Sequence, residues 1–464
     1  MNKSQINGNN DSLFANDTRT LALHLLNKID KKKYTLDNLL EEFQRKYDLP
    51  KREKALFNAL VYGVLRWRSR LDWIIQQFSK QPLEKTNAEI LNILRLGLFQ
   101  IIHLNRIPIS AAVNTSVEIA KHVAGIKSSG YVNAVLRRTG REYKSLCFPD
   151  INNKPEYAIS VNKSFPEWMI KRWIGLLGKK SAIDLCDAIN NIPPITIRVN
   201  ILKTNRNELI DCIESEVQDV SRTVCSPNGV SFLRPKKPIS EMEAFQKGWF
   251  QVQDEAAQLV ALLLDPEPGE TIMDACAGLG GKTGHIGQLM KNKGSITAID
   301  YEKEKLLKLN LDMERLGITN VKTSMGDLGD PVFLKNYSGK FDRILIDAPC
   351  SSMGVIRRNP DIKWKLTEEK LLFYQKRQFL YLDNLSMVLK PGGIIVYAVC
   401  STEPEENEEV ISKFLLKHPD FIIDDIRCFS KIFEPFVNSE GFIKTYPHIN
   451  NMDGFFIARL KRRI

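Results

Sequence analysis

The sequence predicts a multidomain chain with an all-helical N-terminal bundle, a small α+β middle piece and a C-terminal α/β domain built on a mostly parallel, doubly wound sheet. The chain has 464 residues, of which 43% are hydrophobic. This is more than the roughly 100 to 200 residues of one domain, and it is apolar enough to exclude collagen-like and low-complexity proteins. Helical periodicity runs through the first third, and short β-branched runs alternate with helical ones after Gly269.

The first third is helical from Thr18 to about Glu142. Apolar residues recur there at i, i+3, i+4 and i+7, as on one face of a helix. The segments with this pattern are 18–29, 36–47, 52–67, 71–78, 88–104 and 111–123. The prolines fall between segments, where helices end. We therefore predict a helical domain over residues 1–146.

The middle of the chain is predicted as a linker and a small α+β subdomain over residues 147–250. Pro, Asn and Asp cluster in 147–157, which is typical of a linker. Two helical pieces around 166–178 and 180–189 follow, and then the alternating run 195–202, which predicts a strand.

The last part, residues 251–464, alternates short strands with helices. The predicted strands are 271–277, 295–300, 321–327, 341–349, 393–401 and 454–462. Strands separated by helices imply right-handed crossovers and a largely parallel sheet. Ligands of such sheets bind at the carboxyl ends of the strands.

The positive charge is concentrated in the helical part. Residues 1–150 contain 24 Lys and Arg against 14 Asp and Glu, whereas residues 151–464 contain 42 against 41. This asymmetry favours a polyanion-binding N-terminal module, because nucleic-acid affinity depends largely on phosphate neutralisation. A merely solvated basic surface is the alternative. Arg66, Arg68 and Arg70 are candidate RNA-binding residues, although on a helix they fan over more than one face.

Composition also indicates the cellular compartment of the protein. The eight cysteines occur singly, without a C-x-x-C pair, so we expect reduced thiols and no metal site. The polar segment 1–14 does not resemble a signal peptide, and no apolar run reaches the roughly 18 residues of a membrane span. We expect a cytoplasmic, monomeric protein without a membrane partner.

A glycine-rich turn follows the first strand of the C-terminal domain. Its residues are Cys276, Ala277, Gly278, Leu279, Gly280, Gly281 and Lys282. Glycines there let the backbone approach a ligand. The P-loop pattern fails because it requires glycine at Cys276, and G-x-G-x-x-G fails because Thr283 stands in the third place.

Acidic residues stand at successive strand ends, namely Asp274, Asp300, Asp327 and Asp347. A carboxylate that closes the second strand is suited to accept hydrogen bonds from ribose hydroxyls. Helix capping is the alternative for any one of them, but together they predict an adenosine-type ligand.

Two cysteines follow neighbouring predicted strands, Cys350 in DAPCSS and Cys400 in AVCST. In a doubly wound sheet both reach the same edge. The spacing of Thr402 and Glu405 predicts a capping box for the next helix. A lone cysteine is usually a small buried hydrophobe, but two in equivalent loops favour a chemical role.

These motifs resemble the bacterial Sun/RsmB family of 16S ribosomal RNA cytosine-C5 methyltransferases. The resemblance rests on DACAGLGGKTGHI, FDRILIDAPCSSMGVIRRNPDIKW, LKPGGIIVYAVCSTEPEENEEV and DGFFIARL. It extends to the basic helical region, which is similar to a NusB-like RNA-binding domain, and to the segment RVN at 198–200. It implies a Rossmann-like methyltransferase domain and covers nearly the whole chain.

The resemblance assigns roles to individual residues. Residues 276–282 with Asp300, Asp327 and Asp347 correspond to the S-adenosylmethionine site, Cys400 to the nucleophile, and Cys350 to a second cysteine that helps release product. The family usually has Ala-Pro-Gly-Gly-Lys where this chain has Gly278 to Lys282. The missing proline makes the turn more flexible.

The implied chemistry explains the need for two thiols. A thiolate adds at C6 of cytosine, which makes C5 nucleophilic enough to accept a methyl group. Asp347 is suited to hydrogen-bond the cytosine. The expected partner is 16S ribosomal RNA. Two alternatives stay open: a transfer-RNA methyltransferase of the same fold, and a non-catalytic RNA-binding or ribosome assembly factor.

Overall fold

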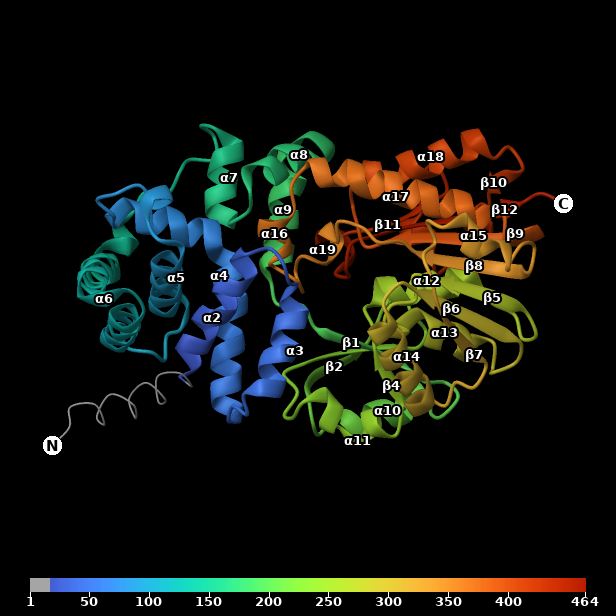
Figure 1. Ribbon diagram of the computed structural model, residues 1–464, viewed down its shortest axis with the longest axis horizontal. Helices are drawn as coiled ribbons and strands as arrows, with labels where there is room; N and C mark the ends of the chain where they lie inside the picture. Colours follow the sequence, from blue (N-terminus) through green and yellow to red (C-terminus); the bar gives the residue numbers. More distant parts are fainter. Residues whose placement is uncertain (1–16) are drawn as a thin grey trace. The chain divides into compact units, whose positions relative to one another are not determined.

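The computed structural model describes residues 17–464, so the segment 1–14 that was compared with signal peptides lies outside the described residues. The chain forms two compact units (Figure 1). The first consists of residues up to Asn190 together with Asn359–Lys365, and the second of Asn191–Arg358 and Leu366–Ile464.

The first unit is all helical, as predicted. Asp17, Thr35 and Asn87 cap helices by accepting hydrogen bonds from backbone amides of the first turn. Its main helices are α2 (Thr18–Asp30), α3 (Leu36–Lys46), α4 (Lys51–Phe78), α5 (Ala88–His103), α6 (Ile109–Glu142), α7 (Pro155–Lys163), α8 (Glu167–Leu177) and α9 (Lys179–Asn190). Helices α2 to α6 enclose one hydrophobic core.

Two helices are longer than their periodic segments. Helix α4 joins the predicted segments 52–67 and 71–78, because the intervening Arg68-Ser69-Arg70 contains no helix breaker. Helix α6 continues to Glu142 through a kink at Gly125, whose φ of 81° favours glycine. The same unit also contains α7, α8 and α9, which the sequence assigned to the middle piece.

A distant segment completes the first unit. Residues Asn359–Lys365, which include α16 (Ile362–Lys365), belong to it although they follow the Cys350 loop in the chain. The Asp361 carboxylate accepts a hydrogen bond from the backbone amide of Leu36 at 3.2 Å, and the Trp364 indole donates to the carbonyl of Leu65 at 2.7 Å. The buried Lys363 ammonium donates to three acceptors, the carbonyls of Arg66 and Ser164 and the amide oxygen of Asn190.

The second unit begins with a small antiparallel sheet in the order β2-β3-β1-β4. Its strands are β1 (Ile195–Val199), β2 (Gln218–Arg222), β3 (Gly229–Leu233) and β4 (Phe250–Val252). Helices α10 (Arg206–Ile213) and α11 (Glu243–Gln246) accompany them. The sequence predicted only β1 of these strands, because the others are short and lack a long alternating pattern.

The large sheet has the order β10-β12-β9-β8-β5-β6-β7, with β11 paired to β12. Its strands are β5 (Thr271–Ala275), β6 (Ser295–Asp300), β7 (Val321–Met325), β8 (Phe341–Asp347), β9 (Leu389–Val399), β10 (Phe421–Ile423), β11 (Ile443–Thr445) and β12 (Phe455–Arg462). Strands β5 to β9 pair in parallel, and β12 pairs antiparallel with β9. The predicted doubly wound, mostly parallel sheet is confirmed.

Helices separate the parallel strands, as the alternating pattern predicted (Figure 1). They are α13 (Gly281–Leu289), α14 (Lys303–Leu316), α15 (Pro331–Lys335) and α17 (Glu369–Ser386). Helix α12 (Glu255–Leu264) precedes β5, and α18 (Glu408–Lys417) and α19 (Pro447–Asn450) follow β9. Within residues 17–464 no helix combines the length and apolar character that a membrane crossing needs.

The RVN segment joins the small sheet to the large one. The buried Arg198 guanidinium donates to the carbonyl of Gly281 at 2.8 Å, at the start of α13. The Asn200 side-chain amide donates to the carbonyls of Gly248 and Leu316, each at 2.8 Å. Arg198 therefore anchors the end of the glycine-rich turn, and Asn200 anchors the end of α14, both through buried hydrogen bonds.

Candidate functional site

The two cysteine loops meet at the carboxyl edge of neighbouring parallel strands. Asp347 at the end of β8 is paired in register with Ala398 near the end of β9. Cys350 and Cys400 follow these strands, and their Sγ atoms lie 3.3 Å apart. Both are only partly exposed thiols. The predicted proximity of the two cysteines is thus a feature of the structure.

Backbone contacts hold the two loops together. The amide of Gly354 donates to the carbonyl of Cys400 at 3.0 Å, and the amide of Gly454 donates to the carbonyl of Gly354 at 2.9 Å. A Cβ atom on Gly354 would lie 1.9 Å from the Gly454 carbonyl oxygen. Only glycine allows this close approach.

The surroundings of the thiols distinguish them. The hydrogen bond with Cys400, together with burial and the nearby Glu406, raises the pKa of Cys350 well above its usual value. Burial and three neighbouring aspartates likewise raise the pKa of Cys276. Both shifts favour the protonated thiol, the form that can donate a proton.

A charged pair stands beside the cysteines. The Lys282 ammonium contacts the Asp347 carboxylate at 2.5 Å and lies over the Phe455 ring, 5.4 Å from its centroid. Burial by itself would lower the pKa of Lys282, but the charge and hydrogen bond of Asp347 outweigh it and raise that pKa. Lys282 is consequently a fixed positive charge at this edge of the sheet.

The glycine-rich turn is anchored to the second strand of the sheet. The amide of Gly278 donates to Asp300 at 2.9 Å, and the other Asp300 oxygen accepts from the amide of Glu302 at 2.9 Å. Gly278 and Gly280 have φ values of 57° and 85°, which favour glycine. Leu279 between them is 55% exposed.

An open cleft of about 610 Å³ lies at the ends of β6 and β7. Tyr301, Glu302, Met325 and Asp327 are among its lining residues, and Asp300 directly precedes Tyr301. Each oxygen of the Asp300 carboxylate retains lone pairs beyond its one backbone partner. The cleft and its acids can therefore accept a ligand that carries hydroxyl groups.

Asp274 differs from the other predicted acids, since it is fully buried and does not line the cleft. Its Oδ2 accepts a hydrogen bond from the Thr283 hydroxyl at 2.6 Å. Burial raises its pKa to about 7, against an ordinary value of 3.8. Asp274 thus ties β5 to α13, and the expectation that it takes part in an adenosine site is corrected.

We expect Asp274→Asn to flatten the dependence of stability on pH. Below about pH 4 the carboxyl is protonated in both states, and between about pH 4 and 7 only the folded state keeps the proton. The free energy of unfolding of the wild type should therefore fall as pH rises through that window, by up to about 3 kcal/mol between pH 5 and 8. Urea unfolding at each pH measures this loss.

The control for this prediction is Asp342→Asn. Hydrogen bonds from Lys390 and the Thr271 amide outweigh burial and lower the pKa of Asp342. Asp342→Asn therefore acts only at and below about pH 4, and it should leave the fall in the free energy of unfolding between pH 5 and 8 unchanged. Equal pH dependence of the Asp274 variant and the wild type would contradict the prediction.

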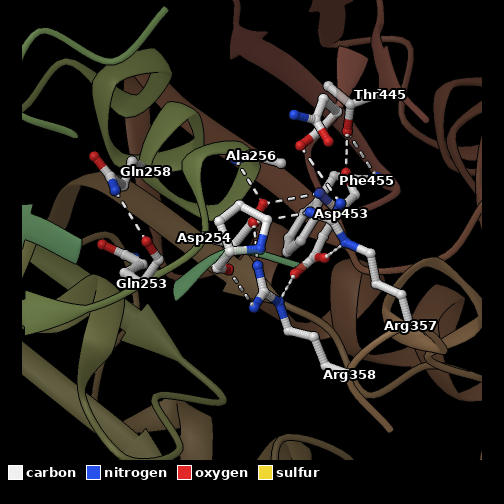
Figure 2. A network of polar contacts seen from close by, with 11 residues as sticks. Gln253, Asp254, Ala256, Gln258, Arg357, Arg358, Thr445, Asp453 and Phe455 are labelled. Atoms are coloured by element: carbon white, nitrogen blue, oxygen red, sulfur yellow. Dashed lines mark hydrogen bonds and ion pairs between the residues drawn. The ribbon is translucent and has the colours of Figure 1, made fainter. Parts of the chain in front are cut away.

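A buried ion-pair network fixes the chain just beyond the Cys350 loop (Figure 2). Arg357 and Arg358 contact Asp453 at 2.5 and 2.7 Å, and Arg358 also contacts Asp254 at 2.7 Å. The amide of Asp453 donates to Asp254 at 2.9 Å. Because each carboxylate and guanidinium has a partner, the network holds this segment rigidly.

Of the three candidate RNA-binding arginines, Arg66 is buried, whereas Arg68 and Arg70 are half-buried. Arg66 is 8% exposed, and Arg68 pairs with Asp30 at 2.7 Å. The Arg70 guanidinium stacks over the Phe148 ring, 4.7 Å from its centroid. Their helix is packed into the core, so these side chains are engaged by their own unit. The three side chains do not form one exposed face, and their contact with RNA stays a prediction.

One residue of the site was missed by the sequence analysis. Glu406 is fully buried between the cysteine loops, whereas the predicted capping box of Thr402 and Glu405 does not form. Pro404–Glu406 is instead a single 3₁₀ turn, and α18 begins at Glu408. Five glutamates close together gave no indication of which one turns inward.

Three family models match the chain, each over a different part. A model described as 16S rRNA methyltransferase RsmB/F matches residues 261–461. The NusB family matches residues 16–141, and an RsmF/B-like ferredoxin-like domain matches residues 165–239.

Curated relatives match over nearly their whole length. The probable ribosomal RNA small subunit methyltransferase B of Bacillus subtilis is 36% identical over 452 residues, covering 96% of this chain and 98% of the relative. The corresponding Synechocystis protein is 34% identical and covers 96% and 99%. Ribosomal RNA small subunit methyltransferase B of Klebsiella pneumoniae is 32% identical and covers 96% and 98%.

Solved structures agree with this fold. The crystal structure of PH0851 has a TM-score of 0.80 at 27% identity and covers 97% of this chain and 98% of its own. NSun6 from Pyrococcus horikoshii with SFG has a TM-score of 0.57 at 25% identity and covers 65% of this chain and 99% of its own.

Proposed function

Because this chain belongs to the RsmB/F family of 16S rRNA methyltransferases, we propose that it transfers a methyl group from S-adenosylmethionine to C5 of a cytosine in 16S ribosomal RNA. The observation that carries the proposal is the pair of thiols 3.3 Å apart at the carboxyl ends of β8 and β9. A cytosine that lies beside this pair can be attacked by one thiol while the other donates a proton.

The cofactor fits the cleft beside the glycine-rich turn. Asp300 is placed to accept from ribose hydroxyls, and Asp327 lines the cleft at the end of β7. Gly278 and Gly281 border open space, where a Cβ atom would meet no other atom closer than 4.0 Å, whereas Gly280 packs against Leu309. When bound, S-adenosylmethionine supplies an electron-poor methyl group.

Cys400 is the proposed nucleophile. Its thiolate adds to C6 of cytosine, and the electron pair of the C5–C6 double bond makes C5 nucleophilic. After C5 has gained the methyl group, a water molecule takes the proton from C5. The electrons of the C5–H bond then restore the double bond and expel the thiolate.

Cys350 and the Asp347–Lys282 pair assist this sequence. In this proposal Cys350, whose raised pKa favours the thiol, donates its proton to the Cys400 sulfur as that sulfur is expelled, and then regains a proton from water. Asp347 accepts a hydrogen bond from the cytosine amine, while Lys282 fixes the orientation of that carboxylate. The target base must be unstacked, which costs a few kcal/mol that RNA contacts elsewhere offset.

The direct test is methylation of defined RNAs. We expect incorporation of labelled methyl groups into 16S ribosomal RNA and bisulfite-resistant cytosine at one site. Incorporation into transfer RNA instead would favour the related transfer-RNA activity. Binding of RNA without binding of S-adenosylmethionine in a calorimetric titration would favour the assembly factor.

A basic stripe on α6 is our candidate for the RNA-contacting surface, in place of the three arginines of α4. Lys127, Arg137 and Arg141 are exposed at helical spacing. Gly130 and Ala134 between them are also exposed, so no acidic side chain interrupts the stripe.

We expect the triple substitution Lys127→Gln, Arg137→Gln and Arg141→Gln to weaken RNA binding at low salt. Each lost phosphate contact reduces the slope of log affinity against log salt by about 0.7 to 0.9, so the slope should fall by up to about 2 to 3. Filter binding at several salt concentrations measures it.

The matched control removes three exposed lysines of the second unit, Lys322, Lys335 and Lys461. It changes the net charge equally. Equal slopes for the two triple variants would show that the stripe on α6 is not the contact surface.

A further inference from the structure

A single carboxylate bridges the two loops that carry the thiols. Glu406 accepts a hydrogen bond from the backbone amide of Ser351 at 2.8 Å and another from the Ser351 hydroxyl. It also accepts from the Ser401 hydroxyl at 2.5 Å. Ser351 follows Cys350 and Ser401 follows Cys400 in the chain, so each contact is one residue from a reacting sulfur.

The carboxylate is itself held in place. Gln378 of α17 donates to Glu406 at 3.0 Å and to the carbonyl of Pro349 at 3.0 Å. The Tyr397 hydroxyl of β9 donates to the carbonyl of Glu406 at 2.6 Å. A buried, fully bonded group of this kind keeps one geometry.

We propose that Glu406 is a positioning residue that sets the distance between the Cys350 and Cys400 sulfurs by tethering both loops to one carboxylate. It does not touch the reacting atoms. The effect of Glu406 on methylation rests on the proposed function. Its effect on the distance between the two sulfurs does not depend on that function.

The charge of Glu406 fits this role. Burial raises its pKa, and the hydrogen bonds from Ser351, Ser401 and Gln378 oppose that rise. The same carboxylate contributes to the raised pKa of Cys350. It therefore also favours the thiol form of Cys350, next to the thiol that must attack.

The experiment uses the intact chain and measures the rate at which Cys350 and Cys400 form a disulfide with diamide. The two thiols lose their hydrogens to the diazene, which is reduced to the hydrazide, so no other reagent is needed. Peptide mass spectrometry identifies the bond. At saturating diamide the second step, in which one sulfur displaces the hydrazide from the other, reports the separation of the two sulfurs.

Two variants separate the hydrogen bonds of Glu406 from its charge. In Glu406→Gln the amide oxygen can still accept from Ser351 and Gln378, and the amide nitrogen can donate to a serine hydroxyl. Glu406→Ala removes both arms. The control Glu255→Ala removes another buried glutamate that accepts two backbone amides, those of Cys225 and Ser226, away from the cysteine loops.

We expect Glu406→Ala to slow disulfide formation by roughly 10-fold to 100-fold, as a displacement of about 1 Å does in a reaction that needs alignment. Glu406→Gln and Glu255→Ala should react nearly as fast as the wild type. Wild-type rates in Glu406→Ala would overturn the proposal.

If thermal unfolding shows that Glu406→Ala does not fold, Ser351→Ala and Ser401→Ala replace it. Ser401→Ala removes the Ser401 hydroxyl arm, whereas Ser351→Ala removes only the Ser351 hydroxyl and leaves the Ser351 backbone amide on Glu406. Both should slow disulfide formation, Ser401→Ala more than Ser351→Ala. Because both arms end on one carboxylate, the double variant should be no slower than the more affected single one. Unchanged rates in both single variants would equally overturn the proposal.

Methylation kinetics connect the distance to catalysis. Glu406→Ala should lower kcat while the dissociation constant of S-adenosylmethionine, measured by calorimetry, stays unchanged. Slower disulfide formation with unchanged methylation would leave the positioning role intact and count against the proposed roles of the cysteines. Unchanged disulfide formation with lower kcat would overturn the positioning role alone.

Discussion

Replacing Cys400 with alanine is expected to abolish methyl transfer, with kcat falling below detection. Burial and three aspartates favour the thiol form of Cys276. Burial and Glu406 still favour the thiol form of Cys350 when its hydrogen bond with Cys400 is lost, so we expect neither cysteine to replace the nucleophile. Without a thiolate at C6, C5 stays too electron-poor to accept a methyl group. Incorporation of labelled methyl groups into 16S ribosomal RNA measures the loss.

Cys350→Ala is expected to have a different phenotype from Cys400→Ala, because Cys400 can still attack the base. It should accumulate a covalent complex of protein and RNA that resolves on a denaturing gel. Cys225→Ala is the control, since Cys225 is a partly buried free thiol outside the site. A covalent complex formed by the Cys400 variant would reverse the two assignments.

The parallel sheet could be predicted closely from the sequence. Its five parallel strands are bounded by glycine, proline and charged residues, and hydrophobic β-branched runs mark their interiors. The cysteine loops followed from this, because the carboxyl ends of neighbouring parallel strands share one edge. The predicted segments 341–349 and 393–401 overlap β8 and β9, and for this reason Cys350 and Cys400 could be placed at the same edge of the sheet.

Side-chain orientation could not be predicted in the same way. Asp274 and Asp300 both stand near strand ends, but one lies beneath α13 and the other at the cleft. Arg66 is charged and yet buried, because α4 packs into the core on more than one side. Glu406 belongs to a run of glutamates that look alike in the sequence. Tertiary packing decides each of these cases.

One part of the division into two units could not be predicted from the sequence, because it joins residues that are far apart in the chain. Asn359–Lys365 follows the Cys350 motif and yet belongs to the first unit. With this segment the first unit contains 32 Lys and Arg against 19 Asp and Glu, while the second contains 34 against 36. The separation of charge is sharper than the split at residue 150 indicated.

Removing the first unit is expected to weaken binding of 16S ribosomal RNA by at least about 100-fold at physiological salt, because the remaining unit has a small negative net charge. The suitable variant lacks residues 1–190 and carries seven Gly and Ser residues in place of 359–365. Binding of S-adenosylmethionine should be unchanged, since Asp300, Asp327 and the glycine-rich turn all belong to the second unit. Filter binding and calorimetry measure the two affinities.

The replacement of 359–365 is essential to this test. A variant that lacks residues 1–190 but keeps the native segment leaves Lys363 and Trp364 without their partners Ser164 and Leu65, and exposes an indole that packs on the core of the first unit. That variant should aggregate, because exposed apolar surface drives association. The Gly and Ser variant should stay monodisperse, since the core clusters of the second unit contain only its own residues. If it binds RNA as tightly as the full chain and with the same salt slope, the helical unit serves another partner and the methyltransferase unit finds the substrate by itself.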